Sequence, residues 1–453
     1  MQSINPANGE KIRQYDEHSW QDVEKRLETA GSCFNSWRRS TFSERAAKMK
    51  KAAGILRERA SELGALMTNE MGKPISAGRK EAEKCAWVCD YYADNAERFL
   101  AREEVDTDAK FSFVSFQPLG PVLAVMPWNF PFWQVFRFAA PALMAGSVGV
   151  LKHASNVPGC ALAIESVFRD AGFPEGCFTT LMIGSKLVDQ VIAHENVVAV
   201  TLTGSTPAGQ AVASSAGKAL KKTVLELGGS DPYVILDDAD IEQAASTCAA
   251  SRMINNGQSC IAAKRFIATD KVHDAFLARV VEQMGSYTPA DPTKEDTKLG
   301  PMAREDLRDE LHDQVKRSIA AGAKLEIGGE VPDQPGAWYP ATVLSNVQPG
   351  TPAYVEEMFG PVASVIRAKD EADAIHIAND SEFGLGAAVF TKNVERGTQI
   401  AEQQLEAGAC FVNAFVKSDP RLPFGGIKTS GYGRELAAFG IREFVNIKTV
   451  YVA

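Results

Sequence analysis

The sequence predicts an α/β protein with two doubly wound α/β domains and a small β ribbon. Three observations support this prediction. The chain has 453 residues, of which 45% are hydrophobic and 23% charged, and this is too long for a single compact core. Short apolar runs alternate with helical stretches in two successive series, as buried parallel strands and crossover helices do. An alternating apolar and polar segment stands apart from both series.

The first hundred residues are predicted to be largely helical. Residues 19–101 are expected to form almost continuous helix, with breaks near 39–41 and 72–74. Ser19 with Asp22, and Thr41 with Glu44, have the spacing of capping boxes. Residues 111–117 then alternate apolar and polar side chains, which predicts a strand with one face exposed or paired across a subunit boundary.

The two series of apolar runs give the predicted strands of the α/β domains. The first series has strands at 122–126, 147–151, 178–183, 197–202 and 223–227. The second has strands at 265–268, 362–366, 387–391 and 409–412. No repeat of solenoid period and no low-complexity linker interrupts them.

Composition excludes several classes of function. Acidic and basic residues are mixed along the chain, with a net charge of −9 and no basic cluster, so nucleic acid is not expected as a partner. No apolar run could span a bilayer and the start has no secretory pattern, so we expect a cytoplasmic protein without membrane association. The eight scattered cysteines are expected to be free thiols, and Cys85 with Cys89 lacks the further ligands of a metal site.

One turn could bind a dinucleotide, although the usual Gly-x-Gly-x-x-Gly fingerprint is absent. The strand at 197–202 leads into residues 203–209, where Gly204 permits a tight turn and Ser205 could donate to a phosphate at a helix N-terminus. Such turns also often connect a strand to a helix without binding any ligand. Lys152 stands just past the end of a predicted strand, where ligands bind in open α/β sheets, but it also fits a solvated loop lysine.

The turn Asn255-Asn256-Gly257-Gln258-Ser259-Cys260 carries the strongest chemical signal. A small polar turn after a helix can expose a thiol among backbone N–H groups, which lower its pKa and hold a developing oxyanion. A lone cysteine is far more often buried and inert, and we expect the other seven to be so.

Five segments, taken together in their order along the chain, indicate that Cys260 is not such an inert cysteine. They are Met126-Pro127-Trp128-Asn129-Phe130-Pro131, Leu225-Glu226-Leu227-Gly228-Gly229-Ser230, Asn256-Gly257-Gln258-Ser259-Cys260, Glu356-Glu357-Met358-Phe359-Gly360-Pro361 and Pro423-Phe424-Gly425-Gly426-Ile427-Lys428-Thr429-Ser430-Gly431. In this order and spacing they resemble the signature elements of the aldehyde dehydrogenase superfamily. Further segments resemble its short bacterial branch of succinate-semialdehyde dehydrogenases.

The resemblance implies a covalent mechanism of aldehyde oxidation. Cys260 would attack the aldehyde, and the Asn129 amide with the Cys260 N–H would hold the oxyanion. Glu226 would activate water against the thioester, its pKa raised by an apolar strand end. Glu435 matches a glutamate that relays protons. On sequence grounds alone, Glu226 also fits an ion-paired strand terminus, and Glu435 fits a salt bridge to Arg434 or another base.

The resemblance also implies a nicotinamide dinucleotide site. Its residues would be Trp128, Lys152, Ser155, Gly184, Gly204, Ser205, Leu227, Glu357 and Phe359. Similarity places Lys152 on the adenine ribose, Ser205 on the pyrophosphate, and Glu357 with Phe359 near the nicotinamide. Ser155 replaces a glutamate that would repel a 2′-phosphate, so NADP⁺ is expected to be accepted, with NAD⁺ not excluded.

The predicted substrate is succinate semialdehyde, converted to succinate. Arg137, with Ser418 and Arg421, would bind its distal carboxylate, although Arg137 fits a solvated or interdomain salt bridge equally well. Ile254 replaces a second arginine of better-known semialdehyde enzymes. Neutral aliphatic or aromatic aldehydes are therefore an alternative, and a catalytically silent relative is a third reading. The glutamate at 226 favours water over coenzyme A as acyl acceptor.

The resemblance further implies a three-part organisation. Residues 1–104 and 121–230 would form the Rossmann-like dinucleotide domain, and residues 231–425 the catalytic domain. Residues 105–120 and 426–453 would form an oligomerisation ribbon and tail, in which 447–452 pairs with the ribbon. Exposed strand edges of this kind are usually covered by another subunit, which predicts a homodimer or homotetramer.

Overall fold

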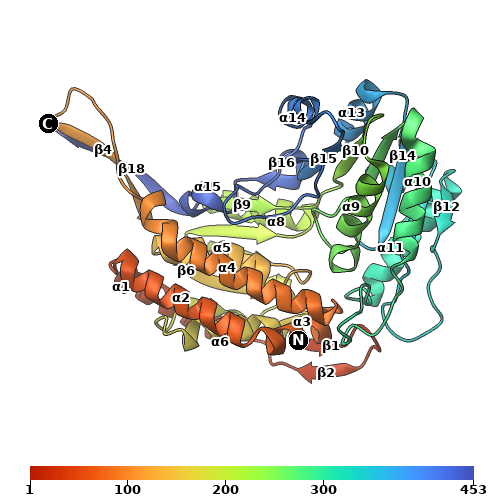
Figure 1. Ribbon diagram of the computed structural model, residues 1–453. Helices are drawn as coiled ribbons and strands as arrows, with labels where there is room; N and C mark the ends of the chain where they lie inside the picture. Colours follow the sequence, from red (N-terminus) through yellow and green to blue (C-terminus); the bar gives the residue numbers. More distant parts are fainter.

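The computed structural model describes all 453 residues as an α/β fold with two large sheets and a projecting ribbon (Figure 1). The chain opens with a small hairpin of β1 (Gln2–Ile4) and β2 (Lys11–Gln14). Four helices follow: α1 (Trp20–Trp37), α2 (Phe42–Glu58), α3 (Ala60–Met71) and α4 (Ile75–Phe99). The predicted helical region and both predicted breaks are confirmed, with one further break at Arg59.

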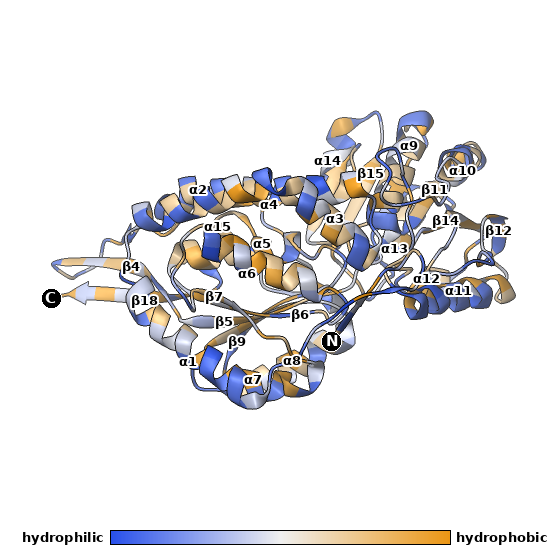
Figure 2. Cartoon of the chain, turned by 90° about the horizontal axis from the view of Figure 1, so that it is seen from below, coloured by the Kyte–Doolittle hydropathy of each residue, from blue (hydrophilic) through white to orange (hydrophobic).

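Both predicted capping boxes are present. The Ser19 and Thr41 side chains accept from the backbone N–H groups of Asp22 and Glu44, whose carboxylates bond back to the capping residues. This reciprocal bonding satisfies free N–H groups of the first turn and fixes where α1 and α2 begin. In Figure 2, α2 and α4 alternate between hydrophilic and hydrophobic segments, as helices with one buried face do.

The first large sheet has the order β17-β9-β8-β5-β6-β7 and is parallel except for β17. Its strands are β5 (Pro121–Met126), β6 (Val148–His153), β7 (Phe178–Thr180), β8 (Ala199–Thr203), β9 (Lys222–Glu226) and β17 (Gly431–Tyr432). The chain runs outward from β5 through β6 to β7, then returns to the other side of β5 with β8. That reversal is the switch point of a doubly wound sheet, where ligands bind at the carboxyl ends of the strands.

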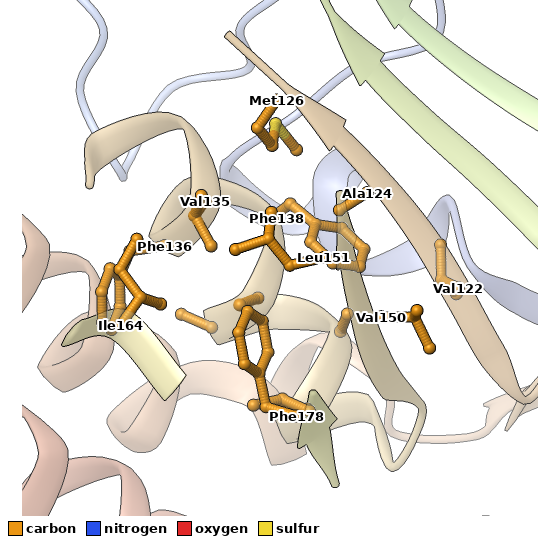
Figure 3. Close-up of a cluster of buried hydrophobic side chains, with 14 of the residues drawn as sticks. Val122, Ala124, Met126, Val135, Phe136, Phe138, Val150, Leu151, Ile164 and Phe178 are labelled. Atoms are coloured by element: carbon orange, nitrogen blue, oxygen red, sulfur yellow. The ribbon is translucent and has the colours of Figure 1, made fainter. Parts of the chain in front are cut away.

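Helices cover both faces of this sheet and bury its apolar strands. They are α5 (Trp133–Ala145), α6 (Pro158–Asp170), α7 (Val188–Ala193) and α8 (Thr206–Lys218), with the short helix η1 (Ser185–Leu187). Figure 3 shows Phe138 of α5 and Phe178 of β7 beside Leu151 and Val150 of β6. All four side chains are at most 6% exposed, so the core fixes α5 against the strands that lead into the switch point.

The second large sheet has the order β12-β13-β14-β11-β10-β15-β16 and is parallel except for the edge strand β12. Its strands are β10 (Pro232–Ile235), β11 (Arg265–Thr269), β12 (Lys324–Ile327), β13 (Thr342–Ser345), β14 (Val362–Ala368), β15 (Gly386–Phe390) and β16 (Ala409–Val412). The helices of this part are α9 (Ile241–Met253), η2 (Ile254–Gly257), α10 (Asp270–Gly285), α11 (Glu305–Ala320), α12 (Pro352–Val355), α13 (Glu371–Asn379) and α14 (Val394–Gln403). Two doubly wound layers are thus confirmed.

Three local predictions need correction. The expected strand at 178–183 ends at Thr180, because the chain turns toward η1. Lys152 lies inside β6 rather than beyond it, since β6 continues to His153 beside β5. All eight cysteines are free, but Cys410 is only partly buried, so not every cysteine other than Cys260 lies in the core.

The ribbon pairs β4 (Phe111–Pro118) with β18 (Val445–Val452) along their whole length, as predicted for the tail. The two-residue strand β3 (Glu103–Glu104) joins the other edge of β4. Figure 1 shows the ribbon projecting from the body, with the C-terminus at its end. The tail also contributes η3 (Lys428–Ser430), β17 of the first sheet and α15 (Ala437–Arg442). None of the helices combines the length and apolar character needed to span a bilayer.

Candidate active site

A cavity of about 1110 Å³ lies at the carboxyl edge of the first sheet and is closed on its other side by the second α/β layer. Pro127, Gly204 and Leu227, which follow β5, β8 and β9, open into it. The predicted site residues that line it are Trp128, Asn129, Gly204, Ser205, Leu227, Cys260, Glu357 and Phe359. The structure therefore brings the predicted nucleophile, the carboxamide and six of the nine predicted dinucleotide residues to one space.

The turn before Cys260 is built from residues that accept a left-handed backbone. Asn255, Asn256 and Gly257 have φ values of 55°, 58° and 76°, a region that asparagine and glycine tolerate best. A β-carbon on Gly257 would overlap the carbonyl group of Gly360. The turn thus rests directly on the backbone of the segment that carries Glu357 and Phe359.

Lys264 stabilises the turn through hydrogen bonds to its backbone carbonyls. Its Nζ donates to the carbonyls of Ser259 at 2.9 Å and of Cys260 at 2.8 Å, and lies 3.3 Å from Oε1 of Glu357. Arg252 donates to the carbonyl of Gly257. Because both cations are fully buried, these bonds hold the backbone on either side of the thiol in one conformation.

The side-chain amide of Asn129 is oriented by its neighbours. Its Oδ1 accepts from Nε2 of Gln134 at 3.0 Å, and its Nδ2 donates to the carbonyl of Gln258 at 3.0 Å. The Asn255 side chain also donates to the carbonyls of Asn129 and Gln258. This network directs the NH₂ group of Asn129 toward the turn that carries Cys260, with its second hydrogen unused.

Cys260 combines a partly exposed thiol with an unused backbone donor. The side chain opens into the cavity, and the N–H of Cys260 has no acceptor within the protein. Burial nevertheless raises the pKa of Cys260 to about 12, although the positive charges of Arg137 and Lys264 act in the opposite direction. The expectation of a lowered pKa is therefore wrong for the protein alone, because desolvation outweighs the donors of the turn.

Glu226 and Glu435 form a buried carboxylate pair behind the cavity wall. Glu226 ends β9, is 2% exposed, and packs against the backbone of Gly425. Burial, followed by the charge of Glu435, raises the pKa of Glu226 well above its ordinary value. Burial also raises the pKa of Glu435, which the ion pair with Arg137 partly offsets. Neither carboxylate lines the cavity itself.

The predicted substrate residues lie outside the large cavity, and each already has a partner. Arg137 is 2% exposed and pairs with Glu435, with its guanidinium 4.5 Å from the ring centre of Phe424. Ser418 is buried and accepts from Nζ of Lys84 at 2.9 Å and from Nε1 of Trp133 at 3.0 Å. Arg421 is exposed and pairs with Asp419 at 2.7 Å.

The dinucleotide side of the cavity has an open helix N-terminus. Ser205 begins the 13-residue helix α8 but its side chain caps no helical N–H, so the hydroxyl is free for a ligand. The rings of Trp128 and Phe359, which both line the cavity, pack edge to face with their centres 5.9 Å apart. The carboxylate of Glu357 accepts a hydrogen bond from the N–H of Gly229 at 3.0 Å. Free N–H groups, a hydroxyl and an aromatic pair fit a pyrophosphate and a flat ring.

Lys152, Ser155 and Gly184 lie along the same edge of the sheet, beyond the large cavity. Lys152 is the penultimate residue of β6 and lies opposite Val125 of β5, and Ser155 is exposed just after the strand. Burial alone lowers the pKa of Lys152, with no charged neighbour contributing. An unpaired cation beside a hydroxyl suits a phosphate group.

A model of the aldehyde dehydrogenase family matches residues 1–450. The chain belongs to this family. It is 52% identical over 451 residues to a probable succinate-semialdehyde dehydrogenase [NADP(+)] of Synechocystis, covering 100% of this chain and 99% of that protein. It is 47% identical over 454 residues to succinate-semialdehyde dehydrogenase [NADP(+)] 1 of Mycobacterium tuberculosis, with the same coverage.

A solved structure of this aldehyde dehydrogenase family has the same fold. It is the succinic semialdehyde dehydrogenase of Streptococcus pyogenes in complex with NADP+ as the cofactor, with a TM-score of 0.97 and 39% sequence identity. The match covers 100% of this chain and 99% of that chain. The predicted family and fold class are confirmed.

Sequence reasoning missed several residues that build the aldehyde dehydrogenase site. Gln134 orients the Asn129 amide, Lys264 holds the turn of Cys260, and Lys84 meets Ser418. Of these, Lys264 had a usable signal: a lysine four residues after the predicted nucleophile and directly before a buried strand. Gln134 and Lys84 follow only from the packing of α4 and α5, which no motif marks.

Proposed function

We propose that this aldehyde dehydrogenase oxidises succinate semialdehyde to succinate with NADP⁺. The observation that carries the proposal is the common cavity that holds the Cys260 thiol, the oriented Asn129 amide and the free helix N-terminus at Ser205. The relatives with 47–52% identity over nearly their whole length act on succinate semialdehyde by name, which supports the same substrate here. The overall change is aldehyde, NADP⁺ and water to carboxylate, NADPH and two protons.

The first chemical step forms a bond between the Cys260 sulfur and the aldehyde carbon. The thiol loses its proton and the carbonyl oxygen becomes negatively charged as the carbon becomes tetrahedral. The free N–H of Cys260 and the second hydrogen of the Asn129 amide can both donate to that oxygen. A nicotinamide cofactor held by Trp128, Glu357 and Phe359 would supply the hydride acceptor, and loss of a hydride from this carbon would leave the Cys260 adduct as a thioester.

The second step is hydrolysis of the thioester, for which we assign Glu226 as the base. Glu226 directly precedes Leu227 and Gly228, which line the cavity, but its carboxylate faces Gly425. Rotation of the side chain would bring it to the cavity, where it can take a proton from water. Its raised pKa makes the carboxylate a stronger base than an ordinary glutamate. Glu435, beside it, would then share the proton.

The preference for NADP⁺ is proposed from the far end of the dinucleotide site. A 2′-phosphate carries negative charge, and Lys152 offers a positive charge that no neighbouring carboxylate neutralises. Ser155 presents a hydroxyl where a glutamate would repel the phosphate. Gly184, at the start of η1, would leave room for the adenosine. NAD⁺ lacks the phosphate and would bind more weakly.

We also propose that the cytoplasmic enzyme is a homodimer or homotetramer assembled through the ribbon. β18 forms an outer edge of its sheet, and Phe111, Ile447 and Tyr451 on the ribbon are 51%, 63% and 52% exposed. An exposed apolar strand edge of this length is usually covered by another chain. The domain boundaries given above belong to the same proposal.

Steady-state kinetics with a panel of aldehydes test the proposed function. We expect the largest kcat/KM for succinate semialdehyde with NADP⁺, a smaller value with NAD⁺, and much smaller values for butanal and hexanal. A Cys260→Ala variant should show no turnover above background. Equal or larger kcat/KM for hexanal would refute the semialdehyde assignment and favour a dehydrogenase of neutral aldehydes. Unchanged turnover by Cys260→Ala would refute the covalent mechanism.

A further inference from the structure

Lys84 is a largely buried cation without a counter-ion. It lies on α4, and its Nζ donates to Oγ of Ser418 at 2.9 Å and stands 4.1 Å from the ring centre of Trp133. The neighbouring charged groups Glu81, Arg137 and Asp419 are each paired with an opposite charge, whereas Lys84 has no carboxylate within ion-pair distance. A desolvated ammonium group in this state attracts an anion.

The carboxylates around Lys84 are all engaged elsewhere. Glu81 pairs with Lys73 and also accepts the N–H groups of Phe132 and Trp133. Asp419 pairs with Arg421 at 2.7 Å. Because each of these negative charges has its own cation, one positive charge remains unbalanced at Lys84.

The groups between Lys84 and the reacting residues also leave its charge unbalanced. Arg137 already has a carboxylate partner within the protein, Glu435. The adjacent Cys85 is fully buried, and its pKa is raised well above the ordinary value, so it stays neutral. Lys84 is thus the cation of this cluster that has no partner.

Helix α5 connects this cluster with the reacting groups. Trp133 stacks under Lys84, and the next residue, Gln134, lines the large cavity and orients the Asn129 amide. Arg137, one turn further along α5, acts electrostatically on both Lys84 and the Cys260 thiol. One turn of α5 therefore carries the ring under Lys84, the glutamine that orients Asn129 and the cation that acts on Cys260.

We propose that Lys84, together with Ser418, binds the distal carboxylate of the substrate and thereby determines its specificity. The Ser418 oxygen accepts from Lys84 and Trp133, which leaves its own hydrogen to donate to one carboxylate oxygen, while Lys84 donates to the other. This inference rests on the proposed function, because it assumes an aldehyde with a carboxylate at its far end.

The test compares charged and uncharged substrates in matched variants. Lys84→Met removes the charge but keeps much of the chain length, and Lys84→Arg keeps the charge. Lys80→Met is the control, since Lys80 is an exposed lysine one turn earlier on the same helix. The measured quantity is the ratio of kcat/KM for succinate semialdehyde to kcat/KM for butanal, each determined with NADP⁺.

We expect Lys84→Met to lower this ratio about 10- to 100-fold, as the loss of a charged hydrogen bond does, with most of the change in KM for the semialdehyde. Lys84→Arg should restore most of the ratio, and Lys80→Met should keep it. Ser418→Ala removes a single oxygen, and it should lower the ratio in the same direction even if Lys84→Met folds poorly.

The pH dependence of the ratio gives a second readout. Burial, with the charge of Arg137, lowers the pKa of Lys84 to about 8, against the opposing effects of Cys85, Glu81 and Asp419. The ammonium form is lost as the pH rises through that value, so the ratio should fall above about pH 8 in the wild type. In Lys84→Arg it should stay level, because arginine keeps its charge.

Two outcomes would overturn the proposal, and they can be told apart. If the wild type prefers succinate semialdehyde but Lys84→Met and Ser418→Ala keep that preference, Lys84 does not bind the carboxylate and the proposed function stands. If the wild type itself shows no preference over butanal, the proposed function fails and this inference fails with it.

Discussion

The oriented amide of Asn129 makes a quantitative prediction about the first chemical step. Two donors face the position of the oxyanion, the N–H of Cys260 and the NH₂ of Asn129, and Gln134 holds the latter through one neutral hydrogen bond of 3.0 Å. Removing one donor of an oxyanion site costs roughly 2.7–4 kcal/mol, or about 10²–10³ in rate. Asn129→Ala should therefore slow hydride transfer by that factor.

Gln134→Leu separates orientation from donation. It leaves the Asn129 amide in place but removes the bond to its Oδ1, which is worth about 0.5–1.5 kcal/mol. The rate of hydride transfer should then fall only about 2- to 10-fold. Asn129→Asp keeps the shape of the side chain but lacks the NH₂ donor, so it should lose at least as much as Asn129→Ala.

The assay is a single-turnover experiment in which NADPH formation is followed by its absorbance after succinate semialdehyde is mixed with enzyme and excess NADP⁺. Thermal unfolding of each variant shows that the fold is kept. A loss of less than tenfold in Asn129→Ala would refute the role of this amide as an oxyanion donor. An unchanged rate in Gln134→Leu would refute the orienting role of the glutamine while leaving the donor role intact.

Three further predictions concern the base and the cofactor. Glu226→Gln should form about one equivalent of NADPH per active site and then turn over about 10²–10⁴-fold more slowly, because the thioester persists; steady turnover at the wild-type rate would contradict this. In the wild type, thioester hydrolysis should speed up as the pH rises, because burial and Glu435 raise the pKa of Glu226 and keep it protonated at low pH. Ser155→Glu should raise KM for NADP⁺ by about tenfold or more through charge repulsion and change KM for NAD⁺ less, measured by cofactor titration; equal changes for both cofactors would place Ser155 away from the phosphate.

Much of the fold could be predicted from local patterns. The four-residue capping boxes that begin at Ser19 and Thr41 predict the starts of two helices. The alternation of apolar and polar residues at 111–117 predicts the ribbon strand. The limits of strands do not follow from such local patterns, as β6 and β7 show. Where a strand ends depends on how it pairs with its neighbours, and the two neighbours of β6 are separated from it in the chain by the helices α5 and α6.

The candidate site was predicted where chemistry follows from a motif and missed where it follows from packing. Cys260 and Asn129 stand in recognisable segments, and they line the same cavity. The pKa of Cys260 was predicted in the wrong direction, because a sequence shows the donors of a turn but not the burial around it. The sequence is compatible with Arg137 either binding substrate or forming a salt bridge. The structure shows a salt bridge to Glu435, a residue far away in the chain that no local pattern connects with Arg137.

The contact of Gly257 with Gly360 bears on how such an enzyme can be altered. Two main-chain segments, one ending in the thiol and one carrying Phe359, touch without any side chain between them. The distance between the Cys260 sulfur and the segment of Phe359 is consequently independent of the side chains that contact the far end of the substrate. New aldehyde selectivity could be installed at Lys84, Trp133 or Ser418 while the reacting atoms keep their places.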